Sequence, residues 1–208
     1  ARVLPYVSFQ EVGELAFYGA KVLHPKTVQP IINQNIQLRV RNTFNPSHEG
    51  TLIGAEMQPA KTVIKAVTSI KNVSMLTVSG RGMLGVPGIA ARTFSAVAER
   101  GASVLMISQS SSEQSICFIV PEDAAARTLN ALERAFEYDM LRHNVERVWC
   151  QSDVAILSVV GEKMKGTPGI AGRLFTALAD AGINILTVAQ GSSEYNISLV
   201  VAQGDGDE

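Results

Sequence analysis

A glycine-rich stretch at residues 80–85 is the first place in this sequence where residue types and spacing could do chemistry. It reads GRGMLG, follows an extended apolar run and precedes a helical pattern. The G-x-G-x-x-G spacing in that context is typical of dinucleotide-binding sites, where the glycines let the backbone approach a pyrophosphate. Such sites also need an acidic residue at the end of the next strand, and Leu105 and Met106 stand there instead. We therefore reject a dinucleotide site.

Two Pro-Gly pairs are better candidates for ligand binding. Pro87-Gly88 and Pro168-Gly169 each stand where a helical pattern begins. The first N–H groups of a helix have no partner inside the helix, and a glycine without a side chain lets a carboxylate come close to them. An α-amino acid would fit such a place. The alternative is that proline and glycine only shape a tight turn here.

These stretches occur in pairs because the chain contains one unit twice. Residues 73–120 align without a gap with residues 154–201, and 22 of the 48 positions are identical. The second copy of the glycine-rich stretch reads GEKMKG and lacks the middle glycine, which is a second argument against a dinucleotide site. Both copies keep Pro-Gly at the helix start and a Gln-x-Ser-Ser-Glu turn, which begins at Gln109 and Gln190. Two copies are too few for a solenoid, so we expect two like modules packed on each other.

The apolar patterns predict the elements that position these residues. In the first copy they are a strand at 73–78, a helix from Pro87 to Gly101, strands at 104–107 and 115–120, a helix from Pro121, and a strand at 145–150. This βαββαβ order is ferredoxin-like. The second copy repeats the first four elements and ends in an acidic tail that we expect to be disordered. A β-branched run at 62–68 would then supply its last strand.

Residues 1–58 follow another pattern. Ser8 and Glu11 have the S-x-x-E spacing of a capping box, so a helix should start there. It should end before His24-Pro25, a second helix should begin at Pro25, and residues 36–40 alternate as a strand. Two helices and a strand are only part of a fold. Because the chain also begins at Ala1, we expect a fragment.

Composition limits the partners and the compartment. The net charge is -1 and basic residues form no block, which argues against nucleic acid. We expect no membrane segment and a cytoplasmic protein, because no apolar run approaches a span and no leader opens the chain. Cys117 and Cys150 have no CxxC spacing and are predicted to be reduced and buried. The three histidines have no partner at ligand spacing, so we expect no metal site.

Three strings near the N-terminus carry a family resemblance. Residues 13–25 read GELAFYGAKVLHP, residues 41–46 RNTFNP and residues 50–53 GTLI, and they resemble the end of the amino-acid-kinase domain of aspartate kinases. The resemblance implies that Lys21 lies near the phosphates of ATP in the whole kinase; a solvated lysine at a helix end is the alternative. The family's other kinase motifs are missing from these residues. The resemblance thus implies a parent kinase that uses ATP and Mg²⁺, and a fragment without catalytic residues that is inactive alone.

The repeat carries a second resemblance. Residues 85–94 read GVPGIAARTF and residues 166–175 read GTPGIAGRLF, and both resemble ACT domains, the modules that follow the kinase domain in aspartate kinases and bind end-product amino acids. The implied fold is α+β, with two ferredoxin-like ACT modules after the last piece of an α/β kinase domain. The expected domains are a kinase remnant at 1–58, a linker and strand completing the second module at 59–72, ACT module 1 at 73–150, ACT module 2 at 151–202, and a disordered tail at 203–208.

The turns after Gln109 and Gln190 resemble those of threonine-sensitive aspartate kinases, where a glutamine at the strand end contacts the effector. A neutral amide can donate to and accept from threonine. A buried lysine ammonium would need a carboxylate, and only Glu113 and Glu194 could supply one. Threonine is favoured, and lysine, with or without S-adenosylmethionine, is the alternative. The predicted effector contacts are Met83, Gly85, Pro87, Gly88, Ile89, Ala90, Gln109, Gly169, Ile170, Asn184, Ile185 and Gln190.

These expectations combine into one hypothesis. The chain should be the regulatory region of an aspartate kinase, acting on a kinase domain in cis through feedback inhibition of aspartate phosphorylation. A separate, non-catalytic regulatory subunit is the alternative. Exposed sheet edges and apolar helix faces favour a homodimer through the modules. Arg92 and Arg173 are expected to be solvated or at an interface. The apolar residues expected in the core are Met75, Leu76, Val78, Phe94 and Val97.

Overall fold

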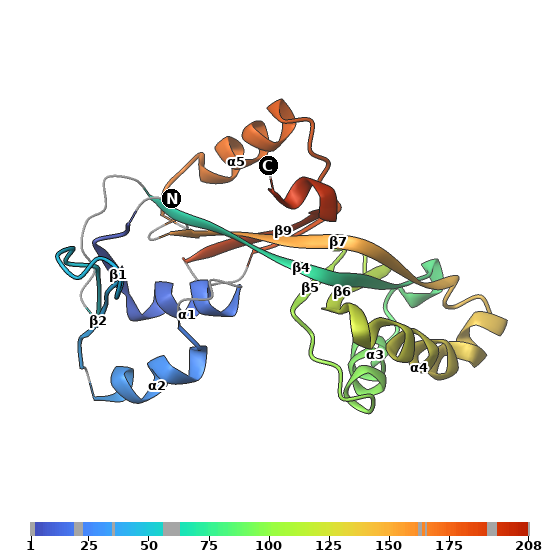
Figure 1. Cartoon of the computed structure of the whole chain (residues 1–208). Coiled ribbons are helices and arrows are strands. Elements are labelled where there is room, and N and C mark those ends of the chain that lie inside the picture. Colours follow the sequence, from blue (N-terminus) through green and yellow to red (C-terminus); the bar gives the residue numbers. More distant parts are fainter. Residues whose placement is uncertain are drawn as a thin grey trace. The chain divides into compact units, whose positions relative to one another are not determined.

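The computed structural model describes residues 3–18, 23–34, 36–55, 63–161, 164, 166–190 and 195–207. By its contacts the chain divides into two compact units (Figure 1). Unit A consists of residues 1–70, 157–182 and 190–198, and unit B of residues 71–156, 183–189 and 199–208.

The strands of the two copies form a six-stranded sheet. Its members are β4 (Ile64–Ser79), β5 (Met106–Gln109), β6 (Ser115–Pro121), β7 (Arg147–Gly161), β8 (Thr187–Ala189) and β9 (Asn196–Ala202). Their order is β5-β6-β4-β7-β9-β8. This sheet contains two overlapping sets of four neighbouring strands, β5-β6-β4-β7 and β8-β9-β7-β4. If the strands of a ferredoxin-like βαββαβ unit are numbered 1 to 4, they lie side by side in the order 2-3-1-4, and both sets have this order. The α+β class with two ferredoxin-like modules is thereby confirmed, and β4 and β7 occur in both sets of four.

The two longest strands differ from the prediction. We predicted separate strands at 62–68 and 73–78 and again at 145–150 and from Val154, but β4 and β7 each run through as one strand. Asn72 and Asp153, which occupy equivalent positions in the two copies, have positive φ angles of 56°. Asparagine and aspartate are among the few residues besides glycine that tolerate this conformation. The chain therefore passes from one segment to the next through a single irregular residue, without a loop.

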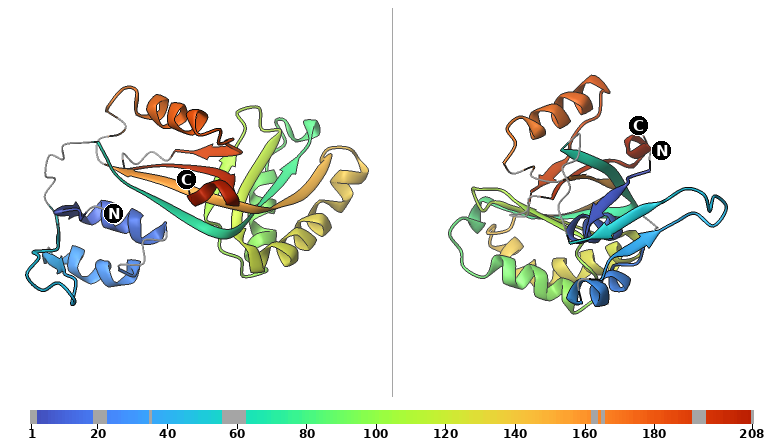
Figure 2. Two further views of the ribbon diagram at one scale, coloured as in Figure 1. Left: turned by 45° about the horizontal axis from the view of Figure 1, so that its top comes forward. Right: turned by 90° about the vertical axis from the view of Figure 1, so that its left-hand side faces the viewer.

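Helices α3 (Ile89–Ala98) and α4 (Glu122–Leu141) lie side by side in unit B (Figures 1 and 2). Between them and the strands lies a core in which Leu76, Val78 and Val97 are buried and half-buried Phe94 meets Phe118 edge to face at 5.6 Å. Buried Met75 completes the five predicted core residues, which are confirmed. The register of β4 against β6 runs from Val73↔Pro121 to Ser79↔Ser115.

The start of α3 was predicted two residues too early. Gly88 takes a φ of 87°, outside the helical region, and the helix begins at Ile89. Pro87 and Gly88 thus form the turn that leads into the helix. Residue 101 is a glycine with a φ of 62°, which agrees with the predicted helix end.

Unit A contains β1 (Tyr6–Ser8), α1 (Phe9–Phe17), α2 (Pro25–Asn33), β2 (Leu38–Val40), β3 (Thr51–Gly54) and α5 (Ile170–Asp180). Its three short strands form a sheet of order β1-β3-β2, and β3 was not predicted. The capping box is confirmed: Ser8 N–H donates to Glu11 Oε2 at 2.9 Å, and Glu11 N–H to Ser8 Oγ at 3.3 Å. Helix α2 begins at Pro25 as predicted.

The predicted tail is ordered. Residues 203–208 were expected to be disordered, but Gln203–Asp207 form the short 3-10 helix η2. Gln203 Oε1 accepts the N–H of Asn72 at 2.9 Å, so a backbone donor at the irregular residue of β4 is satisfied by this segment. The second copy thus has η2 where the first copy has α4.

Two further expectations concern exposure. Cys117 and Cys150 are free thiols, as predicted, but they are half-buried and not buried. Among the described helices, none combines the length and the apolar character that crossing a membrane requires.

Candidate functional site

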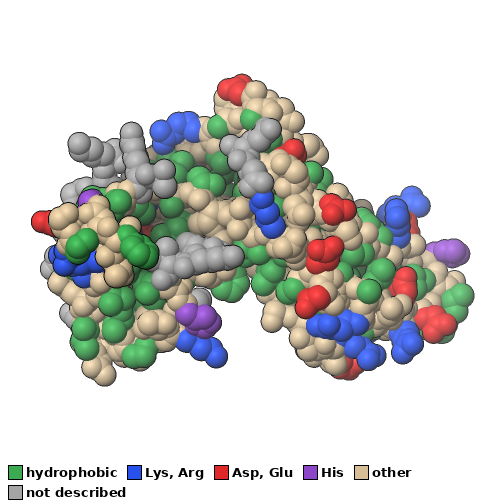
Figure 3. Space-filling view, in the orientation of Figure 1, with side chains coloured by type: hydrophobic (Ala, Val, Ile, Leu, Met, Phe, Trp, Pro, Cys, Tyr) green, Lys and Arg blue, Asp and Glu red, His purple; other side chains and the backbone are tan. Residues whose placement is uncertain are grey.

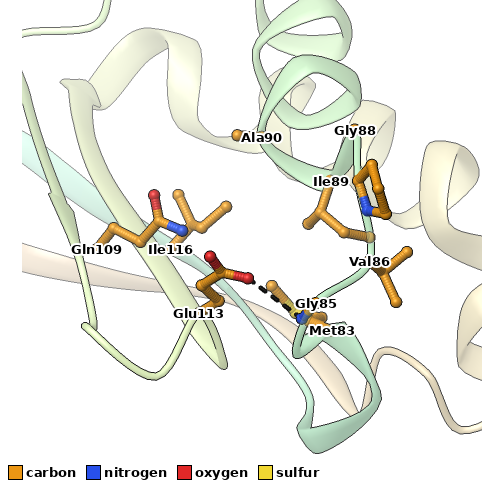
Figure 4. A pocket seen from close by; sticks show the side chains of 10 residues that line it. Met83, Gly85, Val86, Gly88, Ile89, Ala90, Gln109, Glu113 and Ile116 are labelled. Carbon is orange, nitrogen blue, oxygen red and sulfur yellow. Dashed lines mark hydrogen bonds between the residues drawn. The ribbon is translucent and has the colours of Figure 1, made fainter.

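A cavity of about 370 Å³ lies in unit B, where the turn before α3 faces the turn between β5 and β6 (Figure 4). All its lining residues come from the first copy. They are Met83, Gly85, Val86, Pro87, Gly88, Ile89, Ala90, Gln109, Glu113 and Ile116. The structure thus brings together all seven residues that were predicted as effector contacts in this copy. Val86, Glu113 and Ile116 were missing from the predicted site.

One wall is the glycine-rich turn, which contains the 3-10 helix η1 (Arg81–Met83). Gly85 has a φ of 68°. Gly80 and Gly82 face away from the cavity: a Cβ at Gly80 would stand 2.4 Å from Asn144 O, and one at Gly82 would stand 2.5 Å from Asn144 Cα. These two glycines make room for the neighbouring backbone. Packing therefore explains the first two glycines of the G-x-G-x-x-G spacing, and the left-handed φ explains the third.

The start of α3 forms the same wall further along. Gly88 is its N-cap and no side chain caps the helix. Arg92 N–H bonds to Gly88 O at 2.9 Å, so the N–H groups of the three preceding residues have no carbonyl four residues earlier within the helix. Ile89 and Ala90 line the cavity in Figure 4. Free donors at the positive end of the helix dipole favour a carboxylate.

The opposite wall carries the polar side chains. Gln109 ends β5, and Glu113 stands in the turn that follows. Glu113 Oε2 accepts the N–H of Gly85 at 3.2 Å and so joins the two walls (Figure 4). The turn is held by its own bonds, Ser110 N–H to Ser115 O at 3.0 Å and Glu113 N–H to Ser110 O at 2.9 Å. Glu113 could have been found from its place in the shared Gln-x-Ser-Ser-Glu turn.

The chemistry of this arrangement is recognition. Backbone donors, the amide of Gln109 and the carboxylate of Glu113 line the cavity. Buried Met83 and Ile116 add an apolar surface to the lining. Among the described lining residues there is no histidine, cysteine or serine, and Glu113 is the one that ionises. Among the residues that the structure describes, no three His, Cys, Asp or Glu side chains come together as metal ligands would. A small zwitterion with a short side chain matches these groups.

The other predicted contacts lie outside this cavity. Gly169, with a φ of 85°, and Ile170 begin α5 in unit A, where exposed Gln190 also belongs. Asn184 and Ile185 precede β8 in unit B. The turn at 191–194 lies outside the described residues, as does Lys21. Effector contacts in the second copy and the role of Lys21 stay predictions.

A family model described as the ACT domain matches residues 76–136 and 157–208. The chain belongs to the ACT domain family. The two matched segments fall on the two copies of the repeat, so each copy is an ACT module. The cavity at α3 is a cavity of the first ACT module.

Relatives of this ACT-domain chain are long proteins. It is 45% identical over 203 residues to the bifunctional aspartokinase/homoserine dehydrogenase of Haemophilus influenzae. The alignment covers 98% of this chain and 25% of that relative. The chain spans about a quarter of the length of this curated relative. The aspartate kinase of Clostridium acetobutylicum shares the fold, with a TM-score of 0.84, 23% identity and coverage of 98% of this chain and 46% of that one. E. coli aspartokinase III in complex with lysine and aspartate is similar with a TM-score of 0.75 and 25% identity, covering 100% of this chain and 44% of that one.

Proposed function

We propose that this chain is the effector-binding regulatory region of an aspartate kinase and that the cavity at α3 binds a free amino acid, threonine in preference to lysine. The observation that carries the proposal is the cavity itself, which joins an uncapped helix start with the amide of Gln109 and the carboxylate of Glu113. These groups complement the two charged ends of an amino acid and one polar side chain.

The groups suggest a binding orientation. The α-carboxylate would take the N–H groups at the start of α3, where the helix dipole is positive. The α-ammonium would take the carboxylate of Glu113, which has a second oxygen besides the one bonded to Gly85. Gln109 would then donate to or accept from the hydroxyl of threonine, and its methyl group would meet Ile116. A charged effector side chain has no further carboxylate in this lining.

The attached activity is proposed from the relatives. Proteins named as aspartokinases share this chain's sequence over nearly its whole length, and most of their length lies outside it. In such a kinase, a domain outside the matched region would bind ATP and Mg²⁺ and phosphorylate aspartate. Lys21 of this chain would then lie near the phosphates of ATP. An effector regulates such a kinase only if it binds one state of the whole protein more tightly than the other. A homodimer through the ACT modules belongs to the same proposal.

Lysine is the second candidate because Glu113 stands in the cavity. A carboxylate there would suit the ε-ammonium of lysine. The E. coli protein of similar fold is described as a complex with lysine and aspartate. In this orientation Glu113 would bind the side chain of the effector and not its α-ammonium.

Calorimetric titration of the chain with threonine, lysine and S-adenosylmethionine tests the proposal. We expect threonine to bind, and Gln109→Ala to weaken it about tenfold, the usual cost of one lost hydrogen bond to a ligand. Gln114→Ala is the matched control, because Gln114 lies in the same turn but does not line the cavity. Tighter binding of lysine that is lost in Glu113→Gln would favour the second candidate. No heat from any of the three ligands would overturn the proposal.

A further inference from the structure

We propose that Arg92 and Asp139 are positioning residues of the cavity. The ion pair between them fixes the position of α3 relative to the glycine-rich turn. This inference rests on the proposed function, because the cavity is the site that it concerns. Neither residue lines the cavity. They act through a chain of contacts that leaves one wall of the cavity at α3 and returns to the same wall at the glycine-rich turn.

The first contact joins α3 to α4. Arg92 lies one turn beyond the helix start, and its Nη1 is 2.8 Å from Asp139 Oδ2. The guanidinium also lies over the ring of buried Phe136, 4.5 Å from its centroid. The side chain of Asp139 is 11% exposed and that of Arg92 is 41% exposed, so the pair lies at the edge of the solvent with its carboxylate largely covered. This exposure of Arg92 agrees with the prediction that it is solvated, but α4 also supplies two partners that were not predicted. Basic and acidic side chains are interspersed on the part of the surface where α3 and α4 lie (Figure 3).

The second contact fixes the end of α4. The carbonyl of Asp139 accepts N–H groups from Asn144 at 2.9 Å and from Val145 at 3.3 Å, and His143 N–H bonds to Met140 O at 3.1 Å. His143 has a φ of 58°. This is the bond pattern of a Schellman helix end, with histidine at the left-handed position. Asp139 thus holds Arg92 with its side chain and the loop 143–145 with its backbone.

The third contact returns to the cavity. The backbone of Asn144 packs against Gly80 and Gly82 so closely that a side chain fits at neither. Glu146 N–H donates to Ser79 O at 2.8 Å, and Arg81 Nε lies 2.8 Å from Glu146 Oε1. The turn fastened in this way continues into Met83 and Gly85, which line the cavity. The two parts of the wall, α3 and the glycine-rich turn, are therefore joined behind the cavity by way of the end of α4.

The second copy keeps the arginine without this arrangement. Arg173, the counterpart of Arg92, is exposed on α5 and makes no ion pair with any described residue. After β9 the chain forms η2 and no long helix. Arg173 is therefore a matched control. It is the same residue type at the same helix position, but among the described residues it has no counterpart of Asp139 and α4 to pair with.

The test compares Arg92→Ala, Arg92→Lys, Asp139→Asn, the double variant Arg92→Ala/Asp139→Asn and Arg173→Ala. Thermal unfolding first establishes that each variant folds. Calorimetry with threonine should then give a Kd raised about tenfold in Arg92→Ala and in Asp139→Asn. The double variant should be no weaker than either single one, because the two residues act through one contact. Arg92→Lys keeps the charge but loses the planar guanidinium that lies over Phe136, and should recover part of the affinity. Arg173→Ala should bind like the parent chain.

A second readout needs no ligand. Amide hydrogen exchange of residues 83–90 should accelerate at least threefold in Arg92→Ala and stay unchanged in Arg173→Ala. A lowered unfolding temperature with unchanged exchange at 83–90 and unchanged Kd would show a merely structural pair and overturn the inference. If the parent chain binds neither threonine nor lysine, the proposed function fails, and the exchange result alone then decides whether Arg92 holds the cavity in place.

Discussion

Lys65 Nζ lies 2.8 Å from Glu11 Oε2, and only 6% and 1% of the two side chains are exposed. The ion pair joins the beginning of β4 to the first turn of α1 within unit A. The same carboxylate oxygen accepts the N–H and hydroxyl of Ser8. Glu11 therefore both caps α1 and fastens it to β4.

Replacing Lys65 by methionine should destabilise unit A by about 3 kcal/mol, because it leaves the carboxylate of Glu11 buried without its cation. Urea unfolding followed by far-UV circular dichroism would measure the loss. The control is Lys26→Met, whose side chain is exposed on α2 and which should change the free energy of unfolding by less than about 0.5 kcal/mol. Equal effects of the two substitutions would contradict a stabilising role for the pair.

Replacing Gly82 by alanine should cost about 2 kcal/mol, because its Cβ would stand 2.5 Å from Asn144 Cα and backbone must move to admit it. Gly204→Ala is the comparison: a Cβ there meets no atom within 4 Å. Thermal unfolding of both variants measures the difference. Unchanged stability in Gly82→Ala would show that packing is not the reason for this glycine.

Two helix glycines should respond with opposite signs. Gly88→Ala should destabilise unit B by about 1 kcal/mol, because alanine is strained at a φ of 87°. Gly172→Ala, in the interior of α5 with open space around its Cβ, should stabilise unit A by about 0.5 kcal/mol, since alanine is the better helix former. The denaturant midpoint should fall in Gly88→Ala and rise in Gly172→Ala. Midpoints that shift in the same direction in both variants would refute the conformational argument.

The pair formed by Arg81 and Glu146 should make stability depend on pH. The hydrogen bond from Arg81 lowers the pKa of Glu146, and the attraction of its positive charge lowers it further. A carboxyl with a lowered folded-state pKa stabilises the fold above its unfolded-state pKa, and that contribution is lost as pH falls through the folded value. The difference in unfolding free energy between the parent chain and Glu146→Gln should therefore be largest near neutral pH and vanish in acid.

Unfolding curves at several pH values would show this trend. Because both side chains are exposed to solvent, the difference should be small and should shrink further at high salt. Glu133→Gln, on the exposed face of α4 without a partner among the described residues, should show no such dependence. A difference for Glu146→Gln that does not shrink as the pH falls would disprove the electrostatic origin.

Local signals in the sequence were sufficient for several elements. The capping box of Ser8 and Glu11 and the proline at position 25 specify helix starts through their own hydrogen bonds and dihedral angles, so they could be predicted without knowledge of the fold. The repeat also indicated Gly88 and Gln109, which line one cavity, whereas their predicted counterparts Gly169 and Gln190 do not line it. Residues that depend on distant segments could not be predicted in this way.

The missed features are contacts between segments far apart in sequence. Nothing near Arg92 indicates that Asp139 is its partner, and nothing near Gly82 indicates that Asn144 packs against it. Asn72 lies between the strands predicted at 62–68 and 73–78, and no local pattern indicates that the two segments run on as one strand. Glu113 was considered only as a partner for lysine, because its bond to Gly85 depends on how two turns meet in space.

The irregular residues Asn72 and Asp153 show how the two copies depend on each other. The point at which the repeat starts again lies within β7, and the corresponding point before the first copy lies within β4. A break in the gene at either boundary would end a protein in the middle of a strand and leave both sets of four strands incomplete. Each set of four strands includes both β4 and β7, so neither copy completes its four-stranded order without the strand that leads into the other.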